Sequence, residues 1–306
     1  MIREKIYLNQ ILELLKSQIV TIYGASDDVY IDNLADVQHV GLTTLDWVNS
    51  TRKDGQELAE NSPAKVILVD EKIVFSYKIK QDNKTLVVVK DPKLALAIVG
   101  NEYFVQKPTE GIHPTAIIDN NAKIGKHVSI GPYAVIGNVE IGDDSVVSSF
   151  VRLYDNVKIG NNCFIKEGAV IGGAGFGFER DEEGNRFRFP QIGGVIIGNN
   201  VEIGGNTCID RGALSDTVIE DYAKIDNLCH IAHNAHIGKN AVVVACAEVS
   251  GSCSIGEETW VGPNACIRDQ RSVGSNTMVG MGAVVVKHIG NNEVWAGNPA
   301  KKMTKE

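Results

Sequence analysis

The chain has 306 residues, 43% of them hydrophobic and 22% charged, and this composition excludes an intrinsically disordered protein. A net charge of −8, with no Lys/Arg cluster longer than a pair, argues against binding to nucleic acid or to an anionic membrane. No apolar run approaches the ~20 residues of a membrane helix, so we expect no membrane span, no leader segment and a cytoplasmic protein. The six cysteines contain no C-x-x-C pair, which favours reduced thiols over a zinc site or disulfides.

Glycine is unevenly distributed along the chain. Only 4 of the 31 glycines lie in the first hundred residues, so the chain is predicted to contain two regions of different architecture. We expect a small α/β domain over residues 1–108 and a second domain over residues 109–306. A linker near residues 106–111 is expected to join them.

The first region has the sequence pattern of alternating helices and strands. Leu8–Leu15 shows helical apolar spacing, and residues 65–70 and 85–90 are apolar runs of strand length. An Asp-Pro pair at 91–92 is typical of an N-cap followed by an N1 proline, and predicts a helix that ends near Val99.

The second region repeats an aliphatic residue every six positions, a period that belongs to neither an amphipathic helix nor an alternating strand. The residue after the aliphatic one is often glycine, which suits a corner with unusual backbone angles. The pattern predicts a β-solenoid, a left-handed parallel β-helix of hexapeptide repeats with three repeats per coil. The longest unbroken series is Ile219, Ile225, Ile231, Ile237, Val243, Val249, Ile255, Val261, Ile267, Val273, Val279 and Val285.

The period breaks twice, and loops that leave a solenoid usually line a binding face. Residues 172–191 form the first excursion and hold four of the eight phenylalanines. Residues 210–216 carry a four-residue insertion. The phenylalanines of the first excursion are Phe176, Phe178, Phe187 and Phe189.

Three of the seven histidines lie within residues 227–236. His230 and His236 are one hexapeptide apart, so we expect them on different faces of a triangular prism and not at one metal ion. No metal site is therefore predicted within one chain. A metal site between subunits, as in carbonic anhydrases built on this solenoid, is the alternative.

His233 follows the inward-facing Ile231 by two residues, so it is predicted at a corner, pointing outward. A solvated or interface histidine is the simplest interpretation of such a residue. Two nearby residues favour a catalytic role for His233 instead. Asp226, beside an equivalent corner, is a carboxylate of the kind that fixes the tautomer of a base. Gly251, one 18-residue coil later, offers a backbone N–H to a developing oxyanion, so the set suits acyl transfer.

Six motifs within residues 110–290 resemble those of the UDP-3-O-acylglucosamine N-acyltransferases of the lipid A pathway. They are Gly175-Phe176-Gly177-Phe178, Pro190-Gln191-Ile192-Gly193, Val201-Glu202-Ile203-Gly204, Ile209-Asp210-Arg211-Gly212-Ala213-Leu214, Lys224-Ile225-Asp226-Asn227 and Ile231-Ala232-His233-Asn234. The resemblance implies a homotrimer with active sites between subunits and no tightly bound cofactor. It also implies that an acyl carrier protein thioester acylates the amine of a nucleotide-linked amino sugar.

The resemblance also implies roles for individual residues. His233 is the expected general base, Asp226 orients it, and Gly251 supplies the oxyanion hole. Asn234 is expected to bind substrate, and Gln270 stands where the family usually has a second active-site histidine. Gln270 can donate a hydrogen bond but cannot carry a charge.

Two aromatic features bear on substrate binding. In the family an aromatic motif of the preceding α/β domain stacks on uracil; here Trp47 is the expected replacement, and a buried core tryptophan is the alternative. Phe176 and Phe178 are expected to line an acyl groove, with loop anchoring as the alternative.

The chain ends soon after residues 295–301 without the helical tail of many members, an ending that resembles acetyl-CoA-dependent hexapeptide acetyltransferases.

Three functions remain open from the sequence. The first is N-acylation of UDP-3-O-acylglucosamine from an acyl carrier protein. The second is transfer of a short acyl group, acetyl or 3-hydroxybutyryl, from coenzyme A to a UDP- or dTDP-amino sugar of a surface glycan. The third is a protein of a different class: a non-catalytic trimeric scaffold, for which His233 would be dispensable, or a metal-dependent solenoid like the carbonic anhydrases.

Overall fold

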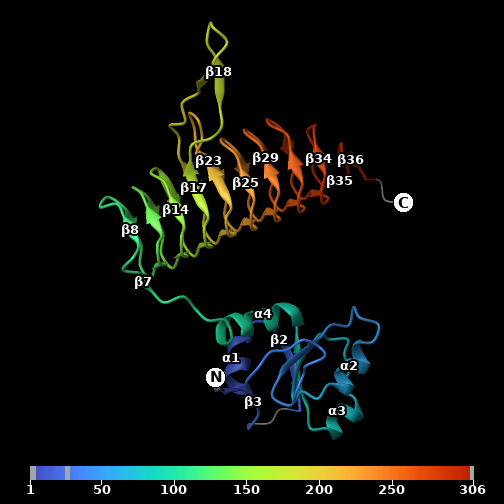
Figure 1. Cartoon of the computed structure of the whole chain (residues 1–306). Helices are drawn as coiled ribbons and strands as arrows, with labels where there is room; N and C mark the ends of the chain where they lie inside the picture. Colours follow the sequence, from blue (N-terminus) through green and yellow to red (C-terminus); the bar gives the residue numbers. More distant parts are fainter. Residues whose placement is uncertain (1–4, 25–27, 304–306) are drawn as a thin grey trace. The chain divides into compact units, whose positions relative to one another are not determined.

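The computed structural model describes residues 5–24 and 28–303 of the chain. The chain divides into two compact units, the first ending at Lys107 and the second beginning at Pro108 (Figure 1). Each unit has its own hydrophobic core.

The first unit is an α/β fold on a four-stranded sheet in the order β2-β6-β5-β4. β4, β5 and β6 run parallel, and β2 pairs antiparallel with β6 at the edge. β1 and β3 form a separate antiparallel pair. The elements are β1 (Ile6–Tyr7), α1 (Leu8–Leu14), β2 (Ile19–Tyr23), β3 (Tyr30–Ile31), β4 (Leu45–Val48), α2 (Gly55–Asn61), β5 (Val66–Val69), α3 (Tyr77–Gln81), β6 (Thr85–Val89) and α4 (Pro92–Tyr103).

The expected helices and strands of this unit are confirmed. β5 and β6 are buried along their whole length, as their apolar runs predict. The Asp91 side chain accepts hydrogen bonds from two backbone N–H groups of the first turn of α4, which is the predicted N-cap. α4 continues past the expected end near Val99, because both Val99 and Gly100 are still buried against the unit's core.

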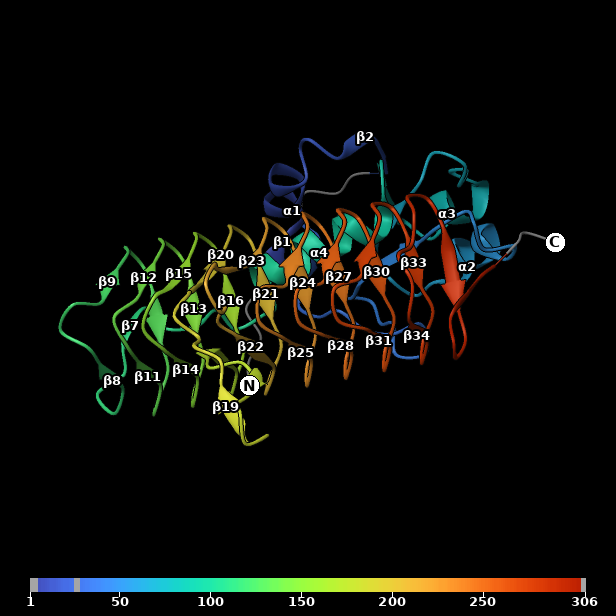
Figure 2. The ribbon, with the colours of Figure 1, turned by 90° about the horizontal axis from the view of Figure 1, so that it is seen from above.

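The second unit is a left-handed parallel β-helix whose strands stack into three sheets (Figure 2). The first sheet holds β7 (Gly111–Ile112), β10 (Ser129–Ile130), β13 (Val146–Val147), β16 (Phe164–Ile165), β21 (Glu202–Ile203), β24 (Lys224–Ile225), β27 (Val242–Val243), β30 (Trp260–Val261), β33 (Met278–Val279), β35 (Val294–Ala296) and β36 (Lys301–Lys302). The second sheet holds β8 (Ile117–Ile118), β11 (Val135–Ile136), β14 (Arg152–Leu153), β17 (Val170–Gly173), β22 (Cys208–Asp210), β25 (His230–Ile231), β28 (Glu248–Val249), β31 (Cys266–Ile267) and β34 (Val284–Val285). The third sheet holds β9 (Lys123–Ile124), β12 (Glu140–Ile141), β15 (Val157–Ile159), β20 (Val195–Ile197), β23 (Thr217–Ile219), β26 (His236–Ile237), β29 (Ser254–Ile255) and β32 (Ser272–Val273).

The six-residue aliphatic period forms the interior of this solenoid, as predicted. In the second sheet Ile209 pairs with Ile231, Ile231 with Val249, and Val249 with Ile267, so equivalent positions of successive coils lie on top of one another. All four side chains are fully buried. β-branched residues pack well on such a surface, and this explains why the core needs few aromatic residues.

The repeated glycine does not have the unusual backbone angles that we expected of it. The left-handed angles occur three residues after the aliphatic position, as at Leu228 and Asn234, with φ of 58° and 59°. The glycine is required for a different reason. A Cβ atom at Gly125 would lie 2.7 Å from the backbone nitrogen of Asp143 in the next coil, so close approach of adjacent coils excludes a side chain there.

Both interruptions of the repeat are loops outside the solenoid core. The first carries an antiparallel hairpin of β18 (Phe178–Arg180) and β19 (Arg186–Arg188), which projects from the second unit (Figure 1). The second connects β22 to β23. Arg211 in the second loop donates a hydrogen bond of 2.7 Å from Nε to the carbonyl oxygen of Gly172 in the first. The two loops therefore meet at one end of β22.

Candidate functional site

A cavity of about 390 Å³ brings four of the predicted site residues together: His233, Gly251, Gln270 and Phe176. It lies where the second sheet turns toward the third, beside the loop that follows β17. Its full lining is Phe176, Asp210, His230, Ala232, His233, Glu248, Ser250, Gly251, Ser252, Asp269 and Gln270.

The imidazole of His233 lies between two glycines. A Cβ atom on Gly251 would lie 2.7 Å from Cε1 and 2.8 Å from Nε2 of His233, so the ring packs directly on that backbone. A Cβ on Gly175 would likewise lie 2.9 Å from Cβ and 3.0 Å from Cδ2 of the same histidine. His233 therefore packs closely on both glycine backbones, and we call this place the histidine slot.

The tautomer of His233 follows from the hydrogen bonds of Asn234. The amide Nδ2 of Asn234 donates to the carbonyl oxygen and the hydroxyl of Ser215, at 3.2 and 2.8 Å, and its Oδ1 accepts from the backbone N–H of Ala213 at 3.0 Å. These bonds assign Oδ1 as the atom 3.2 Å from Nδ1 of His233. Because Oδ1 only accepts, Nδ1 carries a proton. In the neutral form of the ring the lone pair is then on Nε2, against Gly251.

We expect Asn234→Ala to lower the turnover of acyl transfer by about tenfold or more while leaving the KM values unchanged, because the imidazole loses the acceptor that fixes its tautomer. Steady-state kinetics measure both parameters. Asn240→Ala is the matched control, since Asn240 occupies the next corner with a φ of 55° and, among the described residues, its side chain bonds only Glu258. Equal turnover in the two variants would contradict the positioning role.

The backbone N–H of Gly251 has no hydrogen-bond partner among the residues that the structure describes. Its neighbours are both paired: the N–H of Ser250 donates to Ile267 O at 3.1 Å and that of Ser252 to His233 O at 2.9 Å. The one unpaired amide of this segment thus lies beside the histidine ring, where the sequence places the oxyanion donor.

Asp226 does not contact His233 within the chain. Its carboxylate accepts hydrogen bonds from the backbone N–H groups of Asn227 and Ala245, at 2.7 and 3.2 Å. The physical reason is the six-residue period, because a spacing of seven residues puts Asp226 at the preceding corner, one sheet away. Asn234 makes the contact that the resemblance assigned to Asp226.

His230, in the same cavity, is held between two carboxylates. Its Nε2 lies 3.1 Å from Oδ2 of Asp210, and its Nδ1 lies 2.9 Å from Oε2 of Glu248. The hydrogen bonds to Asp210 and Glu248 raise the pKa of His230 from 6.5 to about 10. With both nitrogens protonated and donating, His230 has no lone pair for base catalysis. The sequence motifs do not single out Glu248; its spacing of 18 residues from His230, one coil, is the signal that marks it.

The raised pKa of His230 predicts a pH-dependent difference in stability. The stabilisation that its charge provides is fully present below about pH 6.5 and is lost as the pH rises through 10. The gap in thermal midpoint between the wild-type protein and His230→Gln is therefore expected to shrink from pH 6.5 to pH 10. Calorimetry across this range measures it, and a gap independent of pH would contradict the assignment.

The histidines do not gather around a common point. His236 lies on the third sheet, with Nε2 2.8 Å from Oε1 of Glu220, while His230 lies on the second. In the part of the chain that the structure describes, no three His, Cys, Asp or Glu side chains are arranged to hold a metal ion. Among the same residues, no helix has the length and apolar character to cross a membrane.

Known proteins match both the repeat and the whole chain. The family described as bacterial transferase hexapeptide (six repeats) matches residues 138–173 and 216–251, and the hexapeptide repeat of succinyl-transferase matches residues 121–149. The UDP-3-O-acylglucosamine N-acyltransferase of Coxiella burnetii is 36% identical over 260 residues, which is 77% of this chain and 74% of that protein. The enzyme of the same name from Delftia acidovorans is 33% identical over 95% of this chain and 86% of its own length. The chain belongs to the UDP-3-O-acylglucosamine N-acyltransferase family. It is an acyltransferase.

Solved structures show the same solenoid. The UDP-N-acetylglucosamine O-acyltransferase of Moraxella catarrhalis aligns with a TM-score of 0.58 at 30% identity, covering 63% of this chain and 73% of that one. The UDP-N-acetylglucosamine acyltransferase of Francisella novicida aligns with a TM-score of 0.58 at 25% identity, covering 63% and 70%. The resemblance inferred from the motifs is thus confirmed, as is the fold class.

The remaining predicted residues lie outside the His233 cavity of this acyltransferase. Phe178 packs edge to face on Phe176, with ring centroids 4.8 Å apart, and the Arg188 guanidinium lies 5.0 Å from its ring centroid. Trp47 is half-buried against the core of the first unit and lines a separate cavity of about 380 Å³, together with Asn49 and others. Trp47 thus packs partly on the core and partly lines a cavity, and its stacking on uracil stays a prediction.

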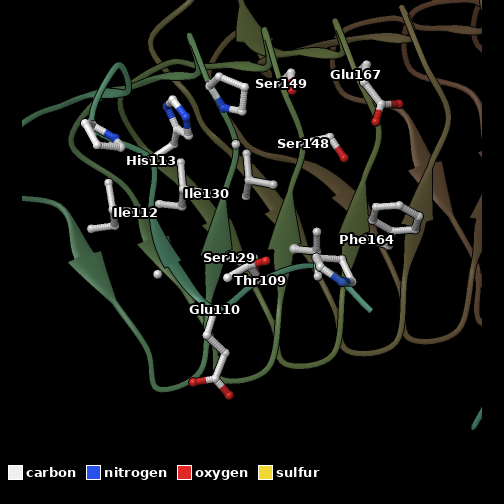
Figure 3. Close-up of a pocket in the computed structure, with 17 residues that line it drawn as sticks. Thr109, Glu110, Ile112, His113, Ser129, Ile130, Ser148, Ser149, Phe164 and Glu167 are labelled. Carbon is white, nitrogen blue, oxygen red and sulfur yellow. The ribbon is translucent and has the colours of Figure 1, made fainter. Parts of the chain in front are cut away.

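A further cavity, of about 530 Å³, lies on the first coils of the second unit, over β7, β10, β13 and β16 (Figure 3). It contains none of the predicted site residues. His113 in its wall lies 2.9 Å from the hydroxyl of Thr115, and no carboxylate of the described residues is bonded to it. The geometry expected for acyl transfer therefore occurs at the His233 cavity and not here.

Proposed function

We propose that this acyltransferase moves an acyl group from an acyl thioester, carried by acyl carrier protein or coenzyme A, to the amino group of a nucleotide-linked amino sugar. The names of its relatives supply the substrate class, UDP-3-O-acylglucosamine. The observation that carries the proposal is the pairing of a histidine with a free Nε2 lone pair and an unpaired Gly251 N–H in one cavity.

The proposed reaction uses these two groups in turn. The sugar amine attacks the thioester carbonyl carbon while Nε2 of His233 accepts its proton. The carbonyl oxygen becomes an oxyanion and takes a hydrogen bond from the Gly251 N–H. The carbon–sulfur bond then breaks, the amide forms, and the thiolate leaves as a thiol with the proton held by His233. No tightly bound cofactor is needed.

Two residues of the cavity wall are proposed to contact substrate. Gln270 lines the cavity with no hydrogen bond from its side-chain amide to any described residue, so the amide is free to donate to a substrate oxygen. Phe176 is 84% exposed and lies at the cavity edge, where it covers a bound acyl or sugar group. Phe178, packed between Phe176 and Arg188, anchors the loop.

The uridine is proposed to bind the first unit, in the cavity that Trp47 and Asn49 line. Trp47 is only half-buried and lines this cavity, and an aromatic ring can stack on a base in an offset arrangement. The cytoplasm, where activated acyl carriers and nucleotide sugars are made, is the proposed location.

The enzyme is proposed to act as a homotrimer with the His233 cavity between subunits. Support comes from a row of apolar side chains left exposed on the first sheet of the solenoid, which a second copy would cover. The row comprises Trp260, Met278 and Val294, which pair on adjacent strands and are each at least 43% exposed.

Mass spectrometry of reactions that combine acyl donors with amino-sugar nucleotides tests the function. The acceptors are UDP-3-O-(3-hydroxyacyl)glucosamine, UDP- and dTDP-amino sugars, and the donors are 3-hydroxyacyl carrier protein, 3-hydroxybutyryl-CoA and acetyl-CoA. We expect one acceptor to gain the mass of one acyl group. Product only from carrier-protein thioesters and UDP-3-O-acylglucosamine assigns the lipid A reaction; product from a short acyl-CoA assigns the second reaction. No product with any pair would refute catalysis.

A further inference from the structure

Three ionisable side chains form a row across successive coils of the second sheet. Asp210 ends β22, His230 begins β25 and Glu248 begins β28, and these strands pair directly with one another. The row is continuous, because each nitrogen of the imidazole contacts one carboxylate. All three residues line the cavity that holds His233 and Gly251.

The row leaves hydrogen-bond acceptors open to the cavity. Oδ1 of Asp210 has no partner among the described residues, and Oε1 of Glu248 has only a 3.4 Å contact with the hydroxyl of Ser250. Asp269 adds a third carboxylate to the lining, whereas His230 is the one cation among the described residues that line the cavity. A ligand that fits this wall carries hydrogen-bond donors, as hydroxyl and amine groups do.

The same wall is unfavourable for hydrocarbon. A methylene group gains about 0.8 kcal/mol when it leaves water for an apolar surface, but here it would displace water from ionised groups. His230 donates a hydrogen bond to each carboxylate, and these bonds keep all three side chains ionised. The free-energy cost of removing water from them therefore remains. Phe176 is the one large apolar side chain of the described residues that lines the cavity.

We propose that Asp210, His230 and Glu248 are specificity-determining residues that bind the hydroxyl- and amine-bearing ring of the acceptor sugar beside His233. The acyl chain of the donor then extends away from this row. His230 positions the two carboxylates and neutralises one of their negative charges. It bonds one oxygen of each carboxylate and leaves the other oxygen for the ligand. This inference rests on the proposed function, from which it takes an amino sugar as the acceptor.

The test uses His230→Gln and Glu248→Gln, with UDP-glucosamine and UMP as probes for calorimetry. Loss of a charged hydrogen bond is expected to weaken UDP-glucosamine binding by about tenfold or more, and to leave UMP, which lacks the sugar, within about twofold of wild type. In the transfer assay, the KM for the acceptor is expected to rise while the KM for the acyl donor stays unchanged.

Matched controls come from the neighbouring sheet. His236→Gln and Glu220→Gln break an ion pair of the same kind, one hexapeptide away and outside the cavity, and are expected to change neither binding constant. A rise in the donor KM instead, or unchanged UDP-glucosamine affinity in both cavity variants, would overturn the proposal. So would wild-type protein that binds UDP-glucosamine no better than UMP. Acyl transfer by the wild-type enzyme is scored separately, so failure of the proposed function is seen as absence of product.

Discussion

Alanine at His233 is expected to lower the turnover of acyl transfer by about 10²- to 10⁴-fold, the usual contribution of a positioned general base. The variant keeps the Gly251 N–H and the substrate contacts, so the substrate KM values are expected to change little. The loss follows because the other imidazole of the cavity cannot replace His233: both ring nitrogens of His230 are bonded to carboxylates. Product formation followed by mass spectrometry measures the effect.

His236→Ala is the matched control for this experiment, because His236 is the next histidine along the chain, lies on the third sheet and is absent from the cavity lining. We expect it to retain wild-type turnover. Unchanged turnover in His233→Ala would instead favour a scaffold protein or a different catalytic centre. Equal losses in the two variants would indicate a general effect on folding.

Gly251→Ala is expected to reduce turnover by about 100-fold, the effect of displacing a reacting group by about 1 Å. The new methyl group would lie 2.7 Å from Cε1 of His233, inside van der Waals contact, and the Gly175 backbone also packs closely on this histidine. The imidazole must therefore leave its slot or push the two coils apart. Turnover and the thermal midpoint, measured together, separate the two results. A displaced imidazole lowers turnover alone, whereas coils that are pushed apart also lower the thermal midpoint.

Gly173→Ala provides the comparison for Gly251→Ala. A Cβ at Gly173 would meet only a ring carbon of Tyr154, at 3.8 Å, so near-normal activity is expected. Comparable loss in the two alanine variants would indicate a general effect of an added side chain and not a displacement of His233. Full activity in Gly251→Ala would refute the packing of His233 on that backbone.

The fold was predictable because the solenoid is periodic. A residue's position in its hexapeptide determines its sheet, its direction and its neighbours one coil away, and counting by 18 was enough to bring Gly251 to His233. The role of the repeated glycine was predicted wrongly, because sequence shows that a side chain is absent but not whether backbone angles or close packing require it. At Gly125 it is the close packing of adjacent coils that requires glycine.

The contacts of the site that the sequence did not predict involve residues inserted into the hexapeptide repeat. Asn234 is fixed by Ala213 and Ser215, which belong to the inserted residues between β22 and β23. An insertion has no periodic neighbours, so no counting rule places these contacts. The same insertion lengthens this coil from 18 to 22 residues, so Cys208 pairs with His230 and Asp210 lies 20 residues before it. Counting by 18 therefore does not find the contact between Asp210 and His230.

The stacking of coils also keeps fraying at the two ends of the solenoid from reaching the His233 cavity. Each coil contacts only its neighbours, so fraying that begins at either end must melt coils one after another before it reaches β25. β25 has five strands of its sheet on one side and three on the other. The backbone amides of the coil that carries His233 are therefore expected to exchange with deuterium more slowly than those of the terminal coils. The enzyme can lose order at its ends and still keep its histidine slot intact.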